Sequence, residues 1–201
     1  MADHEKVNMR EQTARALLVH NQTMGLAIEN DEALAVRGDA DSFTRLYRVH
    51  VRVVYRYLLA RLGNGQDAED VTAQVFERAW TSLSRYAPSG SFKSWLFTIA
   101  QRALIDHYRH HPPRALSVDS LVEVLLDPAA GPEDGALASE QVRQVFQIIT
   151  SLNDEQQEVI RLRFLAELRY DEIAQLTGKR LSAVKMSAYR ALEEIRKEMS
   201  R

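Results

Sequence analysis

Apolar residues recur at every third or fourth position along most of this chain, and no segment of useful length shows the alternation of a β-strand. From Asp39 onward this spacing marks one face of a helix, formed by Phe43, Leu46, Tyr47, Val51, Val54, Leu58 and Leu62. Gly63 and Gly65 are expected to end that helix. The sequence therefore predicts an all-α protein. Its 201 residues, 45% of them hydrophobic, suffice for one or two compact domains.

Two further helices are predicted in the first half of the chain. The second helix is expected to start at Asp67, whose carboxylate can cap free backbone N–H groups. Its inner face consists of Val71, Val75, Ala79 and Leu83, with Phe76 and Trp80 beside them. Ser91 is expected to cap the third helix, which Pro112 and Pro113 end. The inner face of the third helix consists of Phe92, Trp95, Leu96, Ile99, Ala103 and His107.

The rest of the chain divides into a linker and a second helical part. Residues 112–138 are rich in proline, glycine and acidic residues and hold one short apolar patch at 121–126, which is typical of a flexible linker. A helix is expected to begin near Ser139, and Asn153 with Gln156 has the pattern of a capping box at a further start. We therefore predict an extension (1–30), a first helical domain (31–111), a linker (112–138) and a second helical domain (139–201).

The second domain ends in the pattern of a helix-turn-helix. A short helix is predicted over Tyr170 to Leu176, Gly178 supplies the turn, and a longer helix runs from Ser182 to Met199. The predicted inner face of the longer helix is Val184, Ala188, Ala191, Leu192 and Ile195. The opposite side carries Ser182, Met186, Tyr189 and Glu193, flanked by Lys185 and Arg190. Such side chains suit thymine methyl groups, bases and phosphates, although an ordinary helical hairpin has the same periodicity.

Composition limits the classes of function. The chain has no cysteine, so disulfides and thiol redox chemistry are excluded, which suits a reducing cytoplasm. No apolar run approaches the ~20 residues that span a bilayer, and we expect a soluble, unexported, cytoplasmic protein. The net charge of -2 argues against binding of nucleic acid by bulk charge. Any contact with DNA must therefore be local.

Two more segments have both an ordinary and a functional interpretation. Residues 67–80 read as a capped amphipathic helix with acidic residues in its first turn. Residues 91–109 combine closely spaced aromatic residues with Lys93, Arg102 and Arg109, a combination that can stack unpaired bases or simply form a core.

In order and spacing, these segments resemble the extracytoplasmic-function (ECF) sigma factors of bacteria, in the sigma-70 family. The resemblance covers residues 31–196 and depends on four motifs: the start from Gly38 to Tyr47, the helix over 67–80, the helix over 92–108, and 152–190 with the run Tyr170-Asp171-Glu172-Ile173-Ala174. It implies two helical domains, sigma region 2 and the region 4 helix-turn-helix, joined by a flexible linker. It further implies a transcription initiation subunit that directs RNA polymerase to promoters.

The resemblance also implies partners and site residues. Core polymerase would be bound through the coiled coil of its largest subunit and its flap, with promoter DNA and an anti-sigma factor as further partners. Residues that match the core-binding helix are Asp67, Glu69, Asp70, Gln74 and Arg78. Those that match the -10 reading segment are Tyr86, Ser89, Lys93, Arg102, Asp106 and Arg109. Those that match the -35 reading helix-turn-helix are Lys179, Arg180, Ser182, Lys185, Met186, Tyr189 and Arg190.

The chain departs from the family pattern at several positions. The docking helix has Ala73-Gln74 where Gln-Glu is common, and the recognition helix has Ala183 and Ser187 where Thr and Arg are common. These changes alter the expected polar contacts and the -35 sequence that is read. Residues 1–30 extend beyond the minimal family start.

Other chemistries find little support in the sequence. His107, His110 and His111 lie together, but a basic helix end accounts for them better than a metal site does. No catalytic triad or phosphate-binding loop is recognisable, so we expect neither an enzyme nor a cofactor. The alternatives to a sigma factor are a free-standing helix-turn-helix regulator that binds duplex DNA as a dimer, and a helical adaptor or sequestering protein.

Overall fold

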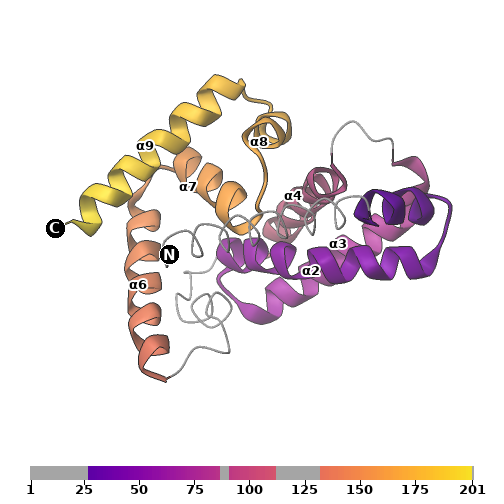
Figure 1. Cartoon of the computed structure of the whole chain (residues 1–201), viewed down its shortest axis with the longest axis horizontal. Helices are drawn as coiled ribbons and strands as arrows, with labels where there is room; N and C mark the ends of the chain where they lie inside the picture. Colours follow the sequence, from indigo (N-terminus) through magenta and orange to yellow (C-terminus); the bar gives the residue numbers. More distant parts are fainter. Residues whose placement is uncertain (1–26, 87–90, 112–131, 201) are drawn as a thin grey trace, which may run out of the picture. The chain divides into compact units, whose positions relative to one another are not determined.

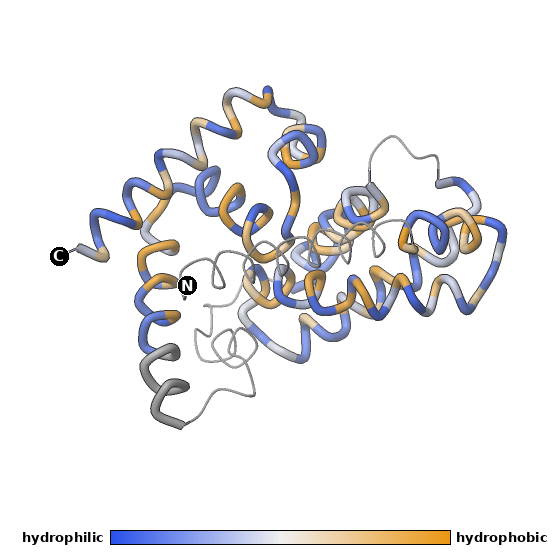
Figure 2. Tube along the Cα trace, viewed as in Figure 1, coloured by the Kyte–Doolittle hydropathy of each residue, from blue (hydrophilic) through white to orange (hydrophobic). Residues whose placement is uncertain are grey.

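The computed structural model describes residues 27–86, 91–111 and 132–200, with side chains omitted for 132–139, and the described elements are all helical (Figure 1). The predicted all-α class is therefore confirmed. The chain divides into two compact units, one made of Met1–Val49 with Ser82–Tyr86 and the other of His50–Thr81 with Ala87–Arg201. Figure 2 shows apolar residues recurring along the helices, which is the pattern from which the helices were predicted.

The first unit holds a helix over residues 27–36, the start of α2 (Ala40–Leu62) and the short η1 (Leu83–Arg85). The Asp39 carboxylate accepts the Ser42 N–H at 2.9 Å, so α2 begins where the sequence predicts it. Leu46 is buried as expected, whereas Tyr47, predicted on the inner face, is 42% exposed.

The second unit begins with the later part of α2, α3 (Gly65–Ser82) and α4 (Phe92–His110). The side chain of Asn64, rather than Asp67, caps α3, because its carbonyl oxygen accepts the Asp67 N–H at 3.0 Å. The predicted cap of α4 is confirmed by Ser91 Oγ, which accepts the Ser94 N–H at 3.1 Å. Trp80, which was predicted to lie beside the inner face of α3, is 41% exposed.

The core of these helices is built largely as predicted. Buried side chains from α3 and α4 include Val71, Val75, Phe76, Ala79, Phe92, Leu96, Ile99 and Ala103. The ring of Tyr57 meets that of Phe97 edge to face, with centroids 5.2 Å apart, and both side chains are fully buried. The spacing of apolar residues alone did not single out these two aromatic residues.

Helix α6 (Pro132–Ser151) starts seven residues before the expected start near Ser139, inside the segment predicted as linker. Proline is tolerated in the first turn of a helix, where its missing N–H would have no helical partner, and the acidic Glu133 and Asp134 favour a helix N-terminus. Linker composition therefore did not exclude a helix here. The apolar patch at 121–126 lies outside the described residues.

The remaining helices agree with the prediction except for one π-helical turn. Asn153 and Gln156 form the predicted capping box at the start of α7 (Asp154–Ile160), with hydrogen bonds of 3.0 and 3.2 Å. The π-helical η2 (Arg161–Leu165) follows directly and was not predicted. Together with α6 and α9 (Leu181–Met199), these helices enclose a small core of Ile149, Leu152, Ile160 and Ala191, against which Val145 and Ile195 pack.

Candidate nucleic-acid interface

The helix-turn-helix consists of α8 (Tyr170–Thr177), a turn at Gly178 and α9. Gly178 has a φ of 68°, in the left-handed region that glycine adopts without a steric penalty. Val184, chosen from the sequence as the inward direction of α9, is fully buried. The outward side of α9 is therefore the side that the sequence indicated.

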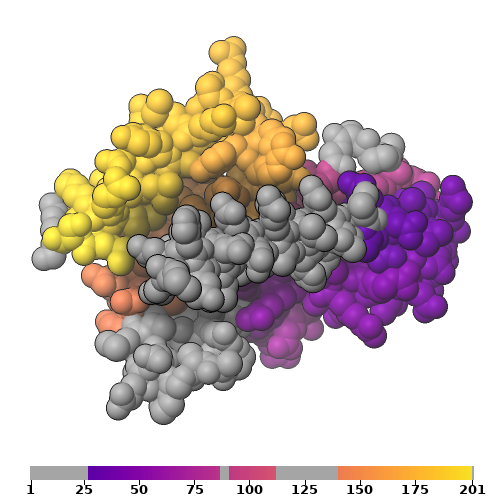
Figure 3. All heavy atoms as spheres, viewed as in Figure 1, coloured from indigo at the N-terminus to yellow at the C-terminus, as the bar shows by residue number. Residues whose placement is uncertain are grey.

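All seven residues predicted to read the -35 element are exposed. Met186 is 50% and Tyr189 is 61% exposed, so both side chains are accessible to a partner. The surface of α9 is yellow in Figure 3. Ser187 is instead buried, and its hydroxyl has no hydrogen-bond partner, so the position where the family commonly has arginine is turned towards the protein.

The cations of α9 differ in whether a carboxylate already pairs with them. Lys179, just before α9, pairs with Glu155 at 2.6 Å, and Arg196 pairs with Glu193 at 2.8 Å. In the described part of the chain, no such ion pair involves Lys185 or Arg190. These two cations can therefore meet a phosphate or a base without first losing a protein partner.

Two arginines that sequence reasoning missed extend this basic surface. Arg163 and Arg169 line one depression with Tyr170 and Lys185, and Arg169 pairs there with Asp171 at 2.8 Å. The Arg163 guanidinium lies over the Tyr170 ring, 5.3 Å from its centroid, which fixes the direction of a long side chain. Arg163 belongs to the unpredicted π-helical turn, so helical periodicity could not have shown where it points.

Helix α3 presents the residues predicted to bind core polymerase on two flanks. A period of 3.6 residues places Asp67, Asp70, Gln74 and Arg78 along one flank and Glu69 along the other. Glu69, Asp70, Gln74 and Arg78 are exposed. The Arg78 guanidinium pairs with the carboxylate of Asp106 on α4 at 2.8 Å, which joins a predicted core-binding residue to a predicted -10 residue.

The predicted -10 residues are also divided by the structure. Arg102, Asp106 and Arg109 share one outward flank of α4, whereas Lys93 lies on the other side of the helix. Arg109 pairs with Asp106 at 3.6 Å. Ser89 lies outside the described residues.

Tyr86 follows η1 in the first unit and is buried, and burial raises its pKa to about 12. Its ring would have to move before it could stack on a base.

The histidines at the end of α4 meet one carboxylate that the sequence did not reveal. The rings of His107 and His111 stack with centroids 4.6 Å apart, and His107 Nε2 lies 4.0 Å from the carboxylate of Asp67. No cluster of three or more potential metal ligands occurs within the described ranges.

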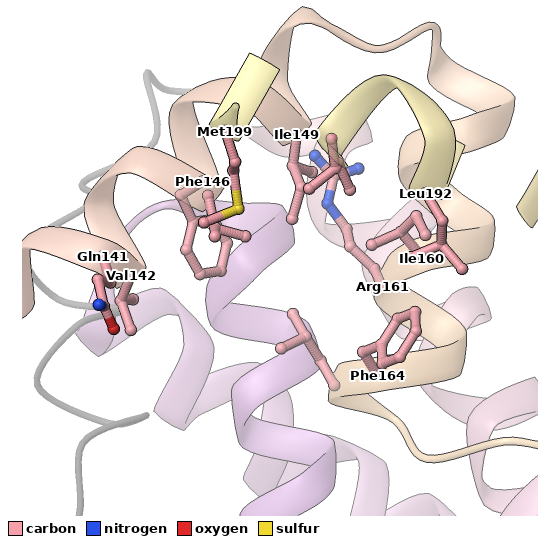
Figure 4. Close-up of a pocket in the computed structure, with 12 residues that line it drawn as sticks. Gln141, Val142, Phe146, Ile149, Ile160, Arg161, Phe164, Leu192 and Met199 are labelled. Atoms are coloured by element: carbon pink, nitrogen blue, oxygen red, sulfur yellow. The ribbon is translucent and has the colours of Figure 1, made fainter. Parts of the chain in front are cut away.

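An apolar groove of about 500 Å³ lies between α6, η2 and α9 (Figure 4). Phe146, Ile149 and Ile160 contribute to its lining together with the more exposed Phe164, Leu192 and Met199. Leu192, predicted on the inner face of α9, is 39% exposed because this groove is open. The groove is suited to an apolar segment of a partner.

Helix α8, the glycine turn and the exposed, partly cationic α9 have the arrangement of a helix-turn-helix, the class of fold that places its second helix in the major groove of DNA. The family comparisons agree with this class: the model for sigma-70 region 2 matches residues 46–112, and the model for sigma-70 region 4 matches residues 142–195.

Curated relatives cover most of the chain. The ECF RNA polymerase sigma factor BldN of Streptomyces coelicolor is 34% identical over 80% of this chain and 61% of its own length. The RNA polymerase sigma factor YlaC of Bacillus subtilis is 30% identical over 80% of this chain and 94% of its own. The chain thus belongs to the sigma-70 family, as an ECF sigma factor that gives RNA polymerase promoter recognition.

A solved structure supports the same fold. CnrH, in complex with the cytosolic domain of CnrY, matches with a TM-score of 0.64 over 87% of this chain and 97% of its own, at 22% identity. Sigma factors are as a class transcription initiation factors rather than enzymes. No helix in the described part of this chain has the length and apolar character needed to cross a membrane.

Proposed function

We propose that this sigma factor binds core polymerase through α3, the -10 element through α4 and the -35 element through α9, and makes or breaks no bond itself. The observation that carries the proposal is the exposure of all seven predicted residues around α9. Exposed methionine and tyrosine next to two cations without a carboxylate partner suit a DNA groove better than they suit water.

The -35 contacts divide into base reading and phosphate positioning. Met186, Tyr189, Lys185 and Arg190 extend from the middle of the recognition helix and are our candidates for base edges. Arg180 and Ser182 lie near the helix N-terminus, where phosphates are commonly bound. Arg163 enlarges the basic surface beside Lys185, so positive charge is local on a chain with a net charge of -2.

The -10 function is assigned to the exposed flank of α4. Arg102, Asp106 and Arg109 can hold the phosphates and polar edges of an opened strand. Capturing bases there offsets an unstacking cost of a few kcal/mol per base. The helix-turn-helix meanwhile sets the register on the duplex.

The polymerase contacts are assigned to two surfaces. The flank with Asp70, Gln74 and Arg78 is our candidate for the coiled coil of the largest subunit, because an exposed acidic and polar row suits a basic partner. The apolar groove with Phe164, Leu192 and Met199 is our candidate for the flap. Since transcription takes place in the cytoplasm, we infer that the protein acts there.

An anti-sigma factor is a further proposed partner. The sigma factor RpoE of Bartonella quintana, whose structure is similar in fold, has been solved in complex with the anti-sigma factor NepR. By analogy, a regulator of this chain would cover one of its polymerase-binding or DNA-binding surfaces.

The decisive experiment is promoter-dependent transcription with purified core polymerase, with and without this protein. Transcripts that start at a defined position only when both are present support the proposal. Tight, sequence-specific binding to promoter duplex by the protein alone would instead indicate a free-standing regulator, and no effect on core would indicate an adaptor.

A further inference from the structure

A depression of about 310 Å³ lies beside the recognition helix, between α9 and the start of α7. The two helices pack against each other (Figure 1). One flank of α9 lines the depression with residues spaced three and four apart: Ala183, Met186, Ser187 and Arg190. The α7 side lines it with three polar residues: Asn153, Glu155 and Gln156. Since Met186 and Arg190 belong to the proposed -35 surface, the depression adjoins that surface.

Two of the residues that line the depression are smaller than the residues common in the family. Ala183 stands where threonine is common, and Ser187 stands where arginine is common. Because both residues line the depression, a threonine and an arginine at these positions would extend into its space. The open volume thus depends on two residues in which this chain departs from the family pattern.

The polar groups around the depression differ in whether the protein already binds them. The side-chain oxygens of Asn153 and Gln156 accept the backbone N–H groups of the capping box, and the Glu155 carboxylate belongs to an ion pair of 2.6 Å. Within the described ranges, the buried Ser187 hydroxyl has no hydrogen-bond partner, and no ion pair involves Arg190. The groups that remain for a ligand therefore mainly donate hydrogen bonds.

The Ser187 hydroxyl is able to serve a ligand in the depression. Burial of a hydroxyl without a partner is unfavourable in the free protein, and a hydrogen bond gained on binding removes that cost. Rotation about the Cα–Cβ bond to another staggered position turns the hydroxyl towards the depression. This rotation breaks no hydrogen bond, because the hydroxyl has none in the described structure.

The lining of the depression matches the edge of one DNA base. In the major groove, thymine shows its C5 methyl group next to O4, an oxygen that accepts hydrogen bonds. The side chains of Ala183 and Met186 suit the methyl group, and the Ser187 hydroxyl suits O4. Cytosine lacks the methyl group and shows an amino donor in place of O4, whereas a phosphate offers acceptors but no apolar group.

We propose that this depression is a pocket for the major-groove edge of one thymine of the -35 element, in which Ala183 and Met186 contact the methyl group and Ser187 donates to O4. The inference rests on the proposed assignment of α9 to the -35 element. Ser187 was not among the seven residues predicted to read this element. It thereby becomes a residue that determines specificity.

The methyl contact is tested with deoxyuridine, which pairs like thymine and keeps O4 but lacks the methyl group. Each thymine in the -35 region of a promoter that this protein transcribes with core polymerase is replaced singly, on either strand, and holoenzyme binding is titrated. We expect at least one replacement to weaken binding by about threefold to fivefold, the effect of one buried methyl group. Unchanged binding at every thymine would overturn the pocket.

A variant that fills the depression shows whether the methyl group lies there. Ala183→Thr combined with Ser187→Arg restores the residues common in the family, so this double variant should bind the thymine and deoxyuridine promoters equally. Urea unfolding establishes that the double variant folds. If the difference between the two promoters persists, the methyl contact lies outside the depression and the proposal is wrong.

Ser187→Ala tests the hydroxyl separately from the fold. Because the hydroxyl has no partner in the free protein, its removal should leave the urea midpoint unchanged or raised. The preference of the holoenzyme for T·A over the other three base pairs at this position should fall by about threefold or more. The control is Ser200→Ala at the end of α9, which removes a hydroxyl bonded to the Arg196 carbonyl oxygen and should leave the preference unchanged.

The remaining outcomes separate the pocket from the proposed function. An equal loss of affinity on all four base pairs in Ser187→Ala would indicate a phosphate contact and would overturn the thymine assignment. If the parent holoenzyme binds without regard to the -35 sequence, α9 does not read that element, and both the proposed function and the pocket are wrong. If the parent selects a -35 sequence but neither deoxyuridine nor Ser187→Ala changes that selection, the pocket alone is wrong.

Discussion

Lys185 and Arg190 offer a sharp test of the recognition helix, because both are exposed and neither has a carboxylate partner among the described residues. We expect Lys185→Ala and Arg190→Ala each to weaken binding of the polymerase holoenzyme to promoter DNA by about 1 to 3 kcal/mol if they contact bases, which is about 5- to 150-fold. Core binding should not change, since neither residue lies in α3 or in the apolar groove.

The expected loss of affinity depends on whether each cation must first break an ion pair within the protein. Lys179 must lose its ion pair with Glu155, formed at 2.6 Å, before it can meet DNA, so Lys179→Ala should cost less than Lys185→Ala. Arg196, which is paired with Glu193 in the last turn of α9, is the matched control, and Arg196→Ala should have little effect. The predicted order of losses is therefore Lys185 and Arg190 first, then Lys179, then Arg196.

The assay is a titration of holoenzyme on a labelled promoter at several salt concentrations. A contact to phosphate alone lowers the slope of log affinity against log salt by about 0.9 for each contact and weakens all sequences equally. A base contact additionally lowers discrimination between the promoter and a variant -35 sequence. The reasoning is refuted if Lys185→Ala and Arg190→Ala bind like the parent, or if Arg196→Ala is equally damaging.

Three further predictions concern core binding and stability. Asp70→Lys should reduce association with core polymerase at least about tenfold, because it reverses a charge in the proposed contact with the coiled coil. Glu69→Lys on the other flank should reduce it less, and pull-down with core measures both. Burial, reinforced by the Lys93 charge, lowers the pKa of His50 from 6.5 to about 4, so the unfolded chain binds the proton more tightly. The free energy of unfolding should then fall by about 3 kcal/mol as the pH drops from about 6.5 to 4. His50→Leu should remove this pH dependence, which urea titrations at several pH values measure. Ile173→Ala, at a fully buried position of α8, should cost about 2 to 5 kcal/mol, and a loss below about 1 kcal/mol would contradict its place in the core.

Local signals in the sequence were sufficient for most of the helices and for the recognition face, although not for η2 or for the start of α6. The apolar spacing that predicted Val184 as inward also predicted Met186 and Tyr189 as outward, because the period of an α-helix relates these positions whatever packs around them. The caps Ser91 and Asn153 were recognisable because a capping side chain binds a backbone N–H only three residues away. At α3 the sequence predicted Asp67 as the cap, whereas the structure has Asn64 there, and both residue types can cap a helix.

The tertiary structure decided the features that depend on residues far apart in the chain. The Arg163 guanidinium, which belongs to the π-helical turn, lies over the Tyr170 ring. The ion pair between Arg78 and Asp106 connects a predicted core-binding residue on α3 with a predicted -10 residue on α4. The sequence by itself determined an all-helical sigma factor with an outward recognition face, since helical periodicity and short motifs are local. The ion pair between Arg61 and Glu158 spans 97 residues, and no local pattern encodes which distant carboxylate a cation will meet. Only the packing of α2 and α4 against the helix-turn-helix half could reveal that contact.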